Sequence, residues 1–380
     1  MIDLWQKILN PRYARLIQAA GEAKDAASIE RLRREWPSEL VRTAIELAGA
    51  RRKAATKFPG CVESIVADRV GVEQATSKLV ADHKAMRFAQ LTLSQPIVDL
   101  CCGIGGDAMS LSPLGVAGID SNPVRAWMAA HNANCAAVAA DVTSLQLRDR
   151  VYHIDPSRRD EHRRRHEYVD YQPGPDFIER LIEDCPTGAI KLGPGVETAD
   201  LPPDGEIEFI SENGTLVQAV MWRGDLRGSA PYSATLLPEN ITISGEAALP
   251  PESDICRYLY AINPAAERAQ LIGELCAQLE IESIHPQLGL LTADELLQSP
   301  WLTPFELIEQ MPWRPRKVKQ WLDAHHAGII EVKTRGQVVN TDQTQKQLRG
   351  SGDTVYTVFI LRWDRQVIAM ITQRLPRHIN

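Results

Sequence analysis

Four aspartates stand at the ends of four short apolar runs, and together they are the residues of this chain best placed to do chemistry. They are Asp99, Asp120, Asp141 and Asp155. Each apolar run is typical of a buried strand in a parallel sheet. Ligands of open α/β sheets bind at the carboxyl ends of the strands, so we expect these carboxylates to line one site. Carboxylates suit a ligand with an ammonium group and hydroxyls better than one with phosphates, which need positive charge.

A glycine-rich turn follows Asp99 and leads into an expected helix. Gly103, Gly105 and Gly106 lie in this turn, and Asp107 closes it. Glycine allows positive φ and lets the backbone approach a ligand closely. The pattern D-x-x-x-G-x-G-G-D resembles motif I of the class I S-adenosylmethionine-dependent methyltransferases. That resemblance implies an α/β fold with a Rossmann-like core, and S-adenosyl-L-methionine as the cofactor.

The resemblance also implies which residues bind the cofactor. Asp99 and Asp107, with the glycines between them, would line its methionine and ribose side. Asp120 would hold the ribose hydroxyls, and Asp141 would accept from the adenine amine. The full set of candidates is Asp99, Cys101, Gly103, Gly105, Asp107, Asp120, Ser121, Asp141, Val142 and Asp155. Packing and turn geometry would explain Cys101 without a contact, and Asp107 would also suit the first turn of a helix.

The fourth strand ends in Asp155, Pro156 and Ser157, followed by Arg158 and Arg159, at the position of motif IV beside the transferable methyl group. By resemblance, enzymes that methylate exocyclic amines carry two prolines and then an aromatic residue after the acid. Ser157 and Arg158 depart from that pattern. As candidate catalytic residues, Asp155 would orient the acceptor or remove its proton, and Arg158 and Arg159 would clamp a phosphate or carboxylate. The alternative for Arg159 is an ion pair with an acid of the core.

A basic stretch at residues 160–165 follows motif IV, with Tyr168 and Tyr171 close behind. Basic residues interleaved with aromatic ones suit contact with a nucleic-acid backbone together with base stacking. A solvated loop is the alternative. Lys191 ends the fifth expected strand, where it would touch the substrate or belong to a structural turn.

The elements around these residues predict three domains. We expect a helical N-terminal domain at residues 1–88, a Rossmann-like core at 89–248 and a small α+β domain at 253–380. Residues 71–86 and 264–280 each read as one helix, and 300–322 as mixed helix and turn. Asn213-Gly214 between two alternating runs predicts a hairpin. We expect the segment from Gln74 to Thr76 to cap and pack rather than to line the cofactor site.

The C-terminal residues carry a second resemblance. Residues 285–292, the turn at 333–336 and the closing hairpin are similar to the THUMP-like domain of bacterial methyltransferases, which follows a core with a DP-x-RR motif. This resemblance implies an RNA substrate, such as a base of tRNA or rRNA. Two alternatives stay open: a methyltransferase acting on a protein or small molecule, and a non-catalytic RNA-binding protein. The four intact aspartates argue against the second alternative.

Charge is distributed unevenly along the chain. The net charge is -7, but residues 1–85 carry +4 and residues 314–380 carry +7, which leaves -18 for the middle. Basic flanks around an acidic centre fit end modules that bind a polyanion and a core that binds a cation. Solvated faces that happen to be basic are the alternative, and this applies also to the run Arg51-Arg52-Lys53.

Composition excludes several classes of protein. Hydrophobic residues make up 44% and charged residues 24%, which is typical of a globular protein. No apolar stretch approaches the ~20 residues of a membrane span, and no secretory signal is evident. The seven cysteines lack metal-ligand spacing. We therefore expect reduced thiols, no metal and a cytoplasmic location.

Overall fold

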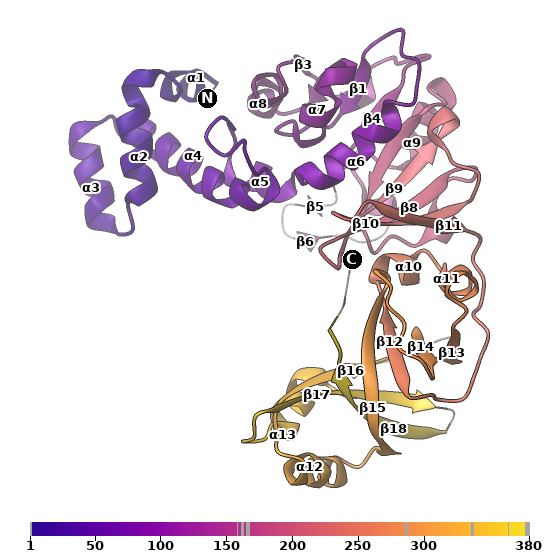
Figure 1. Cartoon of the computed structure of the whole chain (residues 1–380). Coiled ribbons are helices and arrows are strands. Elements are labelled where there is room, and N and C mark those ends of the chain that lie inside the picture. The colour runs from indigo at the N-terminus through magenta and orange to yellow at the C-terminus, as the bar shows by residue number, and fades with distance from the viewer. Residues whose placement is uncertain are drawn as a thin grey trace. The chain divides into compact units, whose positions relative to one another are not determined.

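The computed structural model describes residues 2–157, 159–160, 163–164, 168–285, 288–335, 338–363 and 365–376. The chain divides into two compact units (Figure 1). The first consists of Met1–Pro231 and Leu237–Asn240, and the second of Tyr232–Leu236 and Ile241–Asn380. The three domains expected from the sequence stay a prediction.

Six helices precede the sheet of the first unit, as expected from the sequence. Their bounds are α1 (Ile2–Ile8), α2 (Ala14–Glu22), α3 (Ala26–Glu35), α4 (Ser38–Lys57), α5 (Arg69–Gln74) and α6 (Lys78–Phe88). Asp25 begins α3 with a capping box that includes Ser28, and Pro37 stands just before α4. The buried faces of α1–α4 share one apolar cluster with Ile104 and Met128. These helices therefore pack against the segment that holds the glycine-rich turn.

The expected single helix over residues 71–86 is wrong, because the chain breaks between α5 and α6. Ala75 is extended, and Ser77 is the N-cap of α6, where its hydroxyl accepts from the Val80 N–H. Ser and Thr hydroxyls bond to nearby backbone groups and so favour helix starts over helix interiors. Periodicity of the apolar residues alone did not reveal this break.

One mixed sheet forms the core of the first unit, and within this unit its strands run in the order β8-β9-β7-β4-β1-β2-β3. Their bounds are β1 (Ile97–Leu100), β2 (Val116–Asp120), β3 (Ala136–Ala139), β4 (Tyr152–Ile154), β7 (Gly188–Leu192), β8 (Glu206–Glu212) and β9 (Thr215–Arg223). Strands β1, β2, β3, β4 and β7 are mutually parallel. Strands β8 and β9 form the antiparallel hairpin expected at Asn213-Gly214, where both residues have positive φ. The accompanying helices are α7 (Gly106–Leu111), α8 (Pro123–Ala133) and α9 (Pro175–Asp184). Between β4 and α9 lie the short strands β5 (Arg159–Asp160) and β6 (Arg163–Arg164).

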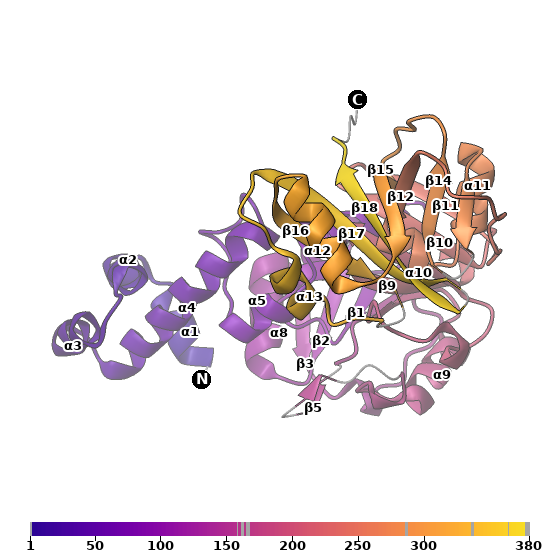
Figure 2. The same ribbon diagram turned by 90° about the horizontal axis from the view of Figure 1, so that it is seen from below.

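The second unit begins with the antiparallel hairpin of β10 (Tyr232–Leu237) and β11 (Ile241–Gly245). A seven-stranded sheet follows in the order β13-β14-β12-β15-β18-β17-β16. Its strands are β12 (Tyr258–Ile262), β13 (Glu282–His285), β14 (Leu290–Ala293), β15 (Leu302–Pro312), β16 (Ala327–Thr334), β17 (Thr354–Trp363) and β18 (Gln366–Arg374). Figures 1 and 2 both show α12 (Pro315–Ala324) and α13 (Thr341–Leu348) beside β16.

Two sequence-based expectations fail in this unit. Residues 302–312 form strand β15 rather than mixed helix and turn, because the strand pairs with β12 on one side and β18 on the other. Such pairing overrides weak local preference. The helix expected over residues 264–280 is two helices, α10 (Pro264–Arg268) and α11 (Ile272–Leu279). Gln270 has a φ of 58° and breaks the run.

Within the described residues, no helix has the length and apolar character needed to cross a lipid bilayer.

Candidate active site

The carboxyl ends of the parallel strands bring three of the predicted aspartates to one edge of the sheet. Leu100 at the end of β1 pairs with Ile119 of β2 and with Ile154 of β4. Two backbone hydrogen bonds extend this edge, from the N–H of Cys102 to the Ile119 carbonyl at 3.0 Å and from the N–H of Asp155 to the Leu100 carbonyl at 3.1 Å. Asp99 and Asp120 stand at the same edge as Asp155.

The glycine-rich turn adopts left-handed backbone conformations at Cys101 (φ 59°), Gly103 (φ 56°) and Gly105 (φ 85°). A Cβ on Gly105 would lie 3.0 Å from the Cα of Ala129, so α8 packs too closely for a side chain there. A Cβ on Gly103 would meet nothing within 4 Å, which leaves open space above the turn. Cys101 takes a conformation that disfavours any Cβ, which supports a role in turn geometry.

Asp120 holds the turn against β2. Its Oδ2 accepts from the Gly103 N–H and its Oδ1 from the Asn122 N–H, both at 2.8 Å. Asp141, in contrast, is exposed and accepts from the backbone N–H of Thr143 at 2.9 Å and from the Thr143 hydroxyl at 2.8 Å. These bonds hold the pKa of Asp141 below its usual range. Of the adjoining candidates, Ser121 is exposed and Val142 is buried.

A buried ionic cluster under the turn escaped sequence analysis. Asp99 Oδ1 lies 2.7 Å from His153 Nδ1, and His153 Nε2 lies 3.0 Å from Lys84 Nζ. Lys84 Nζ lies 2.5 Å from Asp107 Oδ1, and the Thr76 hydroxyl donates to Asp107 Oδ2 at 2.7 Å. The four ionisable side chains are 7% exposed or less. Asp107 is thus held by Lys84 and Thr76 inside the protein, in addition to its place in the first turn of α7.

Burial and nearby positive charge shift the pKa values of Asp99 and Asp107 in opposite directions. Burial raises the pKa of Asp99, against the opposing hydrogen bond from His153. Burial alone would also raise the pKa of Asp107, but nearby positive charge, that of Lys84 first, outweighs it and holds that pKa well below its usual range. Asp99 Oδ2 is buried and has no hydrogen-bond partner among the described residues.

Helix α6 places Lys84 by anchoring itself on the β8–β9 hairpin. His83 Nε2 lies 2.7 Å from Glu208 Oε1, and the indole N–H of Trp222 donates to Glu208 Oε2 at 2.7 Å. Arg87 forms an ion pair with Glu206 and lies over the Trp222 ring, 4.6 Å from its centroid. Residues on either side of Lys84 therefore fix the register of α6 against the sheet.

The break between α5 and α6 packs against the glycine-rich turn. A Cβ on Gly106 would lie 3.1 Å from Ala75 Cβ, so the two segments touch. Lys57 Nζ donates to three carbonyls of residues 72, 73 and 75 at 3.0, 2.8 and 2.7 Å. Ser77 donates to Glu212 of β8 at 2.8 Å. These bonds tie the helical segment to the candidate cofactor site.

Motif IV presents a carboxylate that is paired with a lysine. Asp155 Oδ2 lies 2.6 Å from Lys191 Nζ at the end of β7, and Asp155 is 30% exposed. Burial, together with the charge of Lys191, lowers the pKa of Lys57 to about 8. Arg158 lies outside the described residues, and only the backbone of Arg159 is described, in β5.

The structure does not support two of the nucleic-acid contacts considered from the sequence, those of the two tyrosines and of the run Arg51-Arg52-Lys53. Tyr168 and Tyr171 are 5% and 1% exposed, and the Tyr171 hydroxyl accepts from the Gly193 N–H at 2.7 Å, so neither ring is free to stack on a base. Residues 161, 162 and 165 of the adjoining basic stretch lie outside the described residues. Arg51 donates to the Ile65 carbonyl and Arg52 to that of Gly21, which are structural contacts.

The carboxylates at this edge of the sheet fit a cationic ligand whose hydroxyls donate hydrogen bonds. An unpartnered buried carboxylate oxygen at Asp99, the carboxylate of Asp120 and open space above Gly103 lie around one turn. Within the described residues, no group of three or more His, Cys, Asp or Glu side chains could hold a metal ion.

Comparison with known proteins decides the family. Two proteins of Mycobacterium tuberculosis strains, both named uncharacterized S-adenosylmethionine-dependent methyltransferases, are each 32% identical over 357 residues. That alignment covers 88% of this chain and 96% of each relative. The chain belongs to the S-adenosylmethionine-dependent methyltransferases. Its cofactor, S-adenosyl-L-methionine, supplies a methyl group activated on a sulfonium.

Two further comparisons confirm the fold and the C-terminal module of this methyltransferase. A crystal structure of a putative methyltransferase from Porphyromonas gingivalis W83 matches with a TM-score of 0.76 over 98% of this chain and 99% of that one, at 16% identity. This likeness confirms the expected α/β fold with a Rossmann-like core. Residues 302–374 match the family described as THUMP domain-like, which confirms the second resemblance.

Proposed function

We propose that this methyltransferase modifies RNA and that transfer takes place at the carboxyl edge of the first unit's sheet. Cofactor binding falls to the residues of the turn and of the neighbouring strand ends: Asp99, Cys101, Gly103, Gly105, Asp107, Asp120, Ser121, Asp141, Val142 and Asp155. Asp120 carries the strongest support, because its carboxylate accepts from the N–H of Gly103, the residue of the turn that has open space beside it.

The observation that carries the RNA assignment is one face of helix α12, inside the segment that matches the THUMP domain-like family. Lys317, Trp321 and His325 follow each other at intervals of four residues, so they lie along one stripe of the helix. The rings of Trp321 and His325 stack at 3.7 Å with an interplanar angle of 13°. Basic charge beside a half-buried Trp ring and an exposed His ring suits phosphate contact together with base stacking.

The start of the same helix is unusually positive. Arg314, Arg316 and Lys317 are exposed and stand at its first turn, which contains no acid. Positive charge is unfavourable at this end of a helix dipole, by about 0.3–1 kcal/mol for each charge. Lys319 pairs with Asp323, but the other three cations form no ion pair with the residues that the structure describes. An anionic partner such as an RNA backbone would compensate them.

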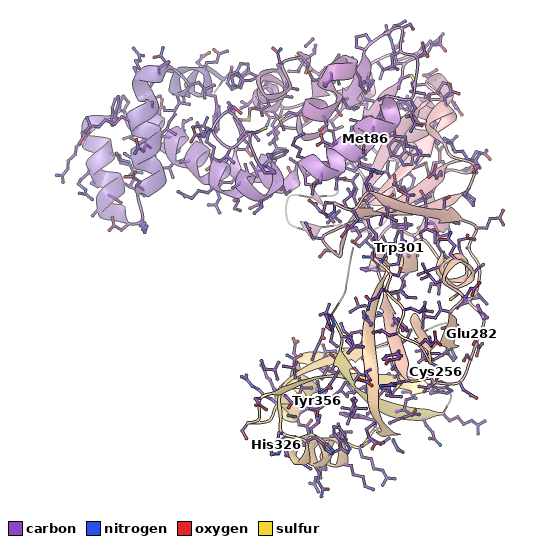
Figure 3. All side chains as sticks on the ribbon, viewed as in Figure 1. Met86, Cys256, Glu282, Trp301, His326 and Tyr356 are labelled. Atoms are coloured by element: carbon purple, nitrogen blue, oxygen red, sulfur yellow. The ribbon has the colours of Figure 1, made fainter. Side chains whose placement is uncertain are left out.

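A second helix extends the positive surface. Exposed Lys346 lies in α13 and exposed Arg349 directly follows that helix, which packs against α12. Figure 3 labels His326 and Tyr356 at this end of the second unit. Tyr356 is buried and supports the stack, with its ring 5.7 Å from that of Trp321 and nearly perpendicular to it. The aromatic stack of the α12–α13 face is therefore supported from inside the unit.

For the transfer step, we assign the acceptor side to Asp155 and Lys191. A carboxylate at the mouth of the site can orient an acceptor or take its proton, and the paired lysine holds that carboxylate in place. Arg158 and Arg159 remain proposed as clamps for a phosphate of the substrate.

The direct test is transfer of a radiolabelled methyl group from S-adenosylmethionine to total small RNA by the full chain. We expect label in RNA that becomes acid-soluble after ribonuclease treatment, and none with an Asp155→Asn variant. Label that enters protein or small molecules instead would favour the alternative substrate classes. RNA binding without affinity for the cofactor would overturn the assignment and leave a non-catalytic RNA-binding protein.

A further inference from the structure

The contact between His153 and Lys84 limits the positive charge of the buried cluster. Nζ of Lys84 and Nε2 of His153 are 3.0 Å apart, which is a hydrogen-bond distance. Two N–H donors cannot bond to each other, so one of these nitrogens must offer a lone pair. A charged lysine can donate to a neutral imidazole, a charged imidazole can donate to a neutral amine, or both groups can be neutral. In each arrangement the pair carries at most one positive charge.

Two carboxylates face this pair. Asp99 bonds to the other ring nitrogen of His153 at 2.7 Å, and Asp107 lies 2.5 Å from Lys84. The other charged groups that act on Lys84 and Asp107 are Lys191 and Asp155, which pair with each other. With both carboxylates ionised, the cluster therefore carries at least one uncompensated negative charge. Asp99 Oδ2, which is buried and unpartnered among the described residues, is the oxygen left without a cation.

Building on the cofactor site proposed above, we propose that Lys84 and His153 are positioning residues of that site, which together carry at most one positive charge and so leave negative charge beside the glycine-rich turn for a cationic ligand. S-adenosylmethionine carries a sulfonium and an ammonium against one carboxylate, a net charge of plus one. Its product, S-adenosylhomocysteine, has lost the sulfonium charge and is neutral overall. The cluster thus favours the methyl donor over the product, and it does so through residues that need not touch either.

Packing of α6 on the sheet does not by itself account for these four buried ionisable side chains. Replacement of a buried ion pair by apolar residues is often neutral for folding, so four ionisable side chains under a ligand-binding turn are a costly way to pack α6 on the sheet. The cluster also ends at the turn: Asp99 precedes it and Asp107 follows it. Its charge is placed where the cofactor of this family binds.

The test measures the affinities of both ligands by calorimetry between pH 5.5 and 7.0, where the α-amino group of each ligand stays protonated. The net charge of the cluster sets the ratio of the two dissociation constants. Asp107→Asn removes one negative charge at nearly the same volume, so the preference for S-adenosylmethionine over S-adenosylhomocysteine should fall by about fivefold or more relative to the wild type. Lys84→Met removes a cation, so the same preference should not fall. A preference that is unchanged in Asp107→Asn, or that falls in Lys84→Met, would overturn the proposal.

Variants of His153 keep the proposal testable if Lys84→Met does not fold. The amide of Asn replaces Nδ1 and can still donate to Asp99, whereas that of Gln replaces Nε2 and can only meet Lys84. We expect His153→Asn to bind S-adenosylhomocysteine within about threefold of the wild type and His153→Gln to lose about tenfold or more. Equal affinities of these two variants, at matched thermal stability, would contradict a positioning role for His153. Neither measurement depends on RNA, so failure here is separable from failure of the RNA assignment.

Discussion

Lys84 Nζ lies 2.5 Å from Asp107 Oδ1, and both side chains are buried, at 2% and 7% exposure. This pair joins helix α6 to the first turn of α7 and thereby to the glycine-rich turn. Burial lowers the pKa of Lys84 while Asp107 acts against it, so the lysine depends on its partner. Lys84 is therefore as much a part of the candidate site as the motif residues around it.

Removal of Lys84 should be costly for folding. We expect Lys84→Met to lower the free energy of unfolding by about 3–5 kcal/mol, because it leaves a buried carboxylate without its cation. The double variant with Asp107→Asn should recover a part of that loss, since no unpaired charge remains. Urea denaturation followed by circular dichroism gives both values. A single variant that is as stable as the wild type would show that the pair does not form.

Acid should weaken the fold through Asp107. The pKa of this carboxylate is held below its usual range, so its ionised form stabilises the native state. That contribution is complete above the unfolded-state value of about 4 and is lost as the pH falls below it. Between pH 5 and 2.5, Asp107→Asn should lose less unfolding free energy than the wild type. Parallel pH profiles for the two proteins would exclude Asp107 as a source of acid lability.

Lys191 should matter for turnover and not for cofactor binding. Lys191→Met releases Asp155, whose Oδ2 lies 2.6 Å from the Lys191 ammonium, from its partner. We expect a fall in the rate of methyl transfer of about 10²-fold, the usual size of a lost acid–base contribution. The dissociation constant for S-adenosylhomocysteine should change less than about threefold. A matched loss of cofactor affinity would instead assign Lys191 to the cofactor side.

The positive start of α12 should set the salt dependence of RNA binding. Replacement of Arg314, Arg316 and Lys317 by Gln should reduce the slope of log affinity against log salt by about 2 to 3, since each phosphate contact contributes about 0.7–0.9. Fluorescence anisotropy with labelled bulk tRNA provides the slope.

Helix α3 offers the matched control for that triple variant. Arg31, Arg33 and Arg34 are exposed there, and their replacement by Gln removes the same charge. This control should keep nearly the wild-type slope. Equal effects of the two triple variants would mean that RNA responds to net charge alone, without a specific α12 surface.

Sequence patterns revealed the parts of the fold that are local. Short apolar runs ending in aspartates, the Asn213-Gly214 turn and the pattern from Asp99 to Asp107 predicted the parallel strands, the hairpin and the motif I turn, which the structure contains. Strand β15 was missed because its pairing partners, β12 and β18, lie far away in the chain and dominate its local preference.

The buried cluster could not be read from the sequence. Lys84 reads as an ordinary polar residue in a helix, and His153 as a polar residue inside an apolar run. Only the packing of α6 brings the lysine within 3.0 Å of His153 across 69 residues of chain. The only sign of the cluster in the sequence is a histidine and a lysine among apolar residues that are expected to be buried. This sign does not indicate which residues they contact. Side-chain burial also explains the error at Tyr168 and Tyr171, since an aromatic residue in a basic stretch looks the same whether it packs inward or outward.

Calorimetric titration with S-adenosylhomocysteine tests the central claim, that the carboxyl edge at Asp99 is the cofactor site, most directly. We predict one site per chain with micromolar affinity in the wild type, and no measurable binding in a folded Asp99→Ala variant. A wild type that does not bind, or an Asp99→Ala variant that binds equally well, would contradict the assignment of the cofactor to this edge of the sheet.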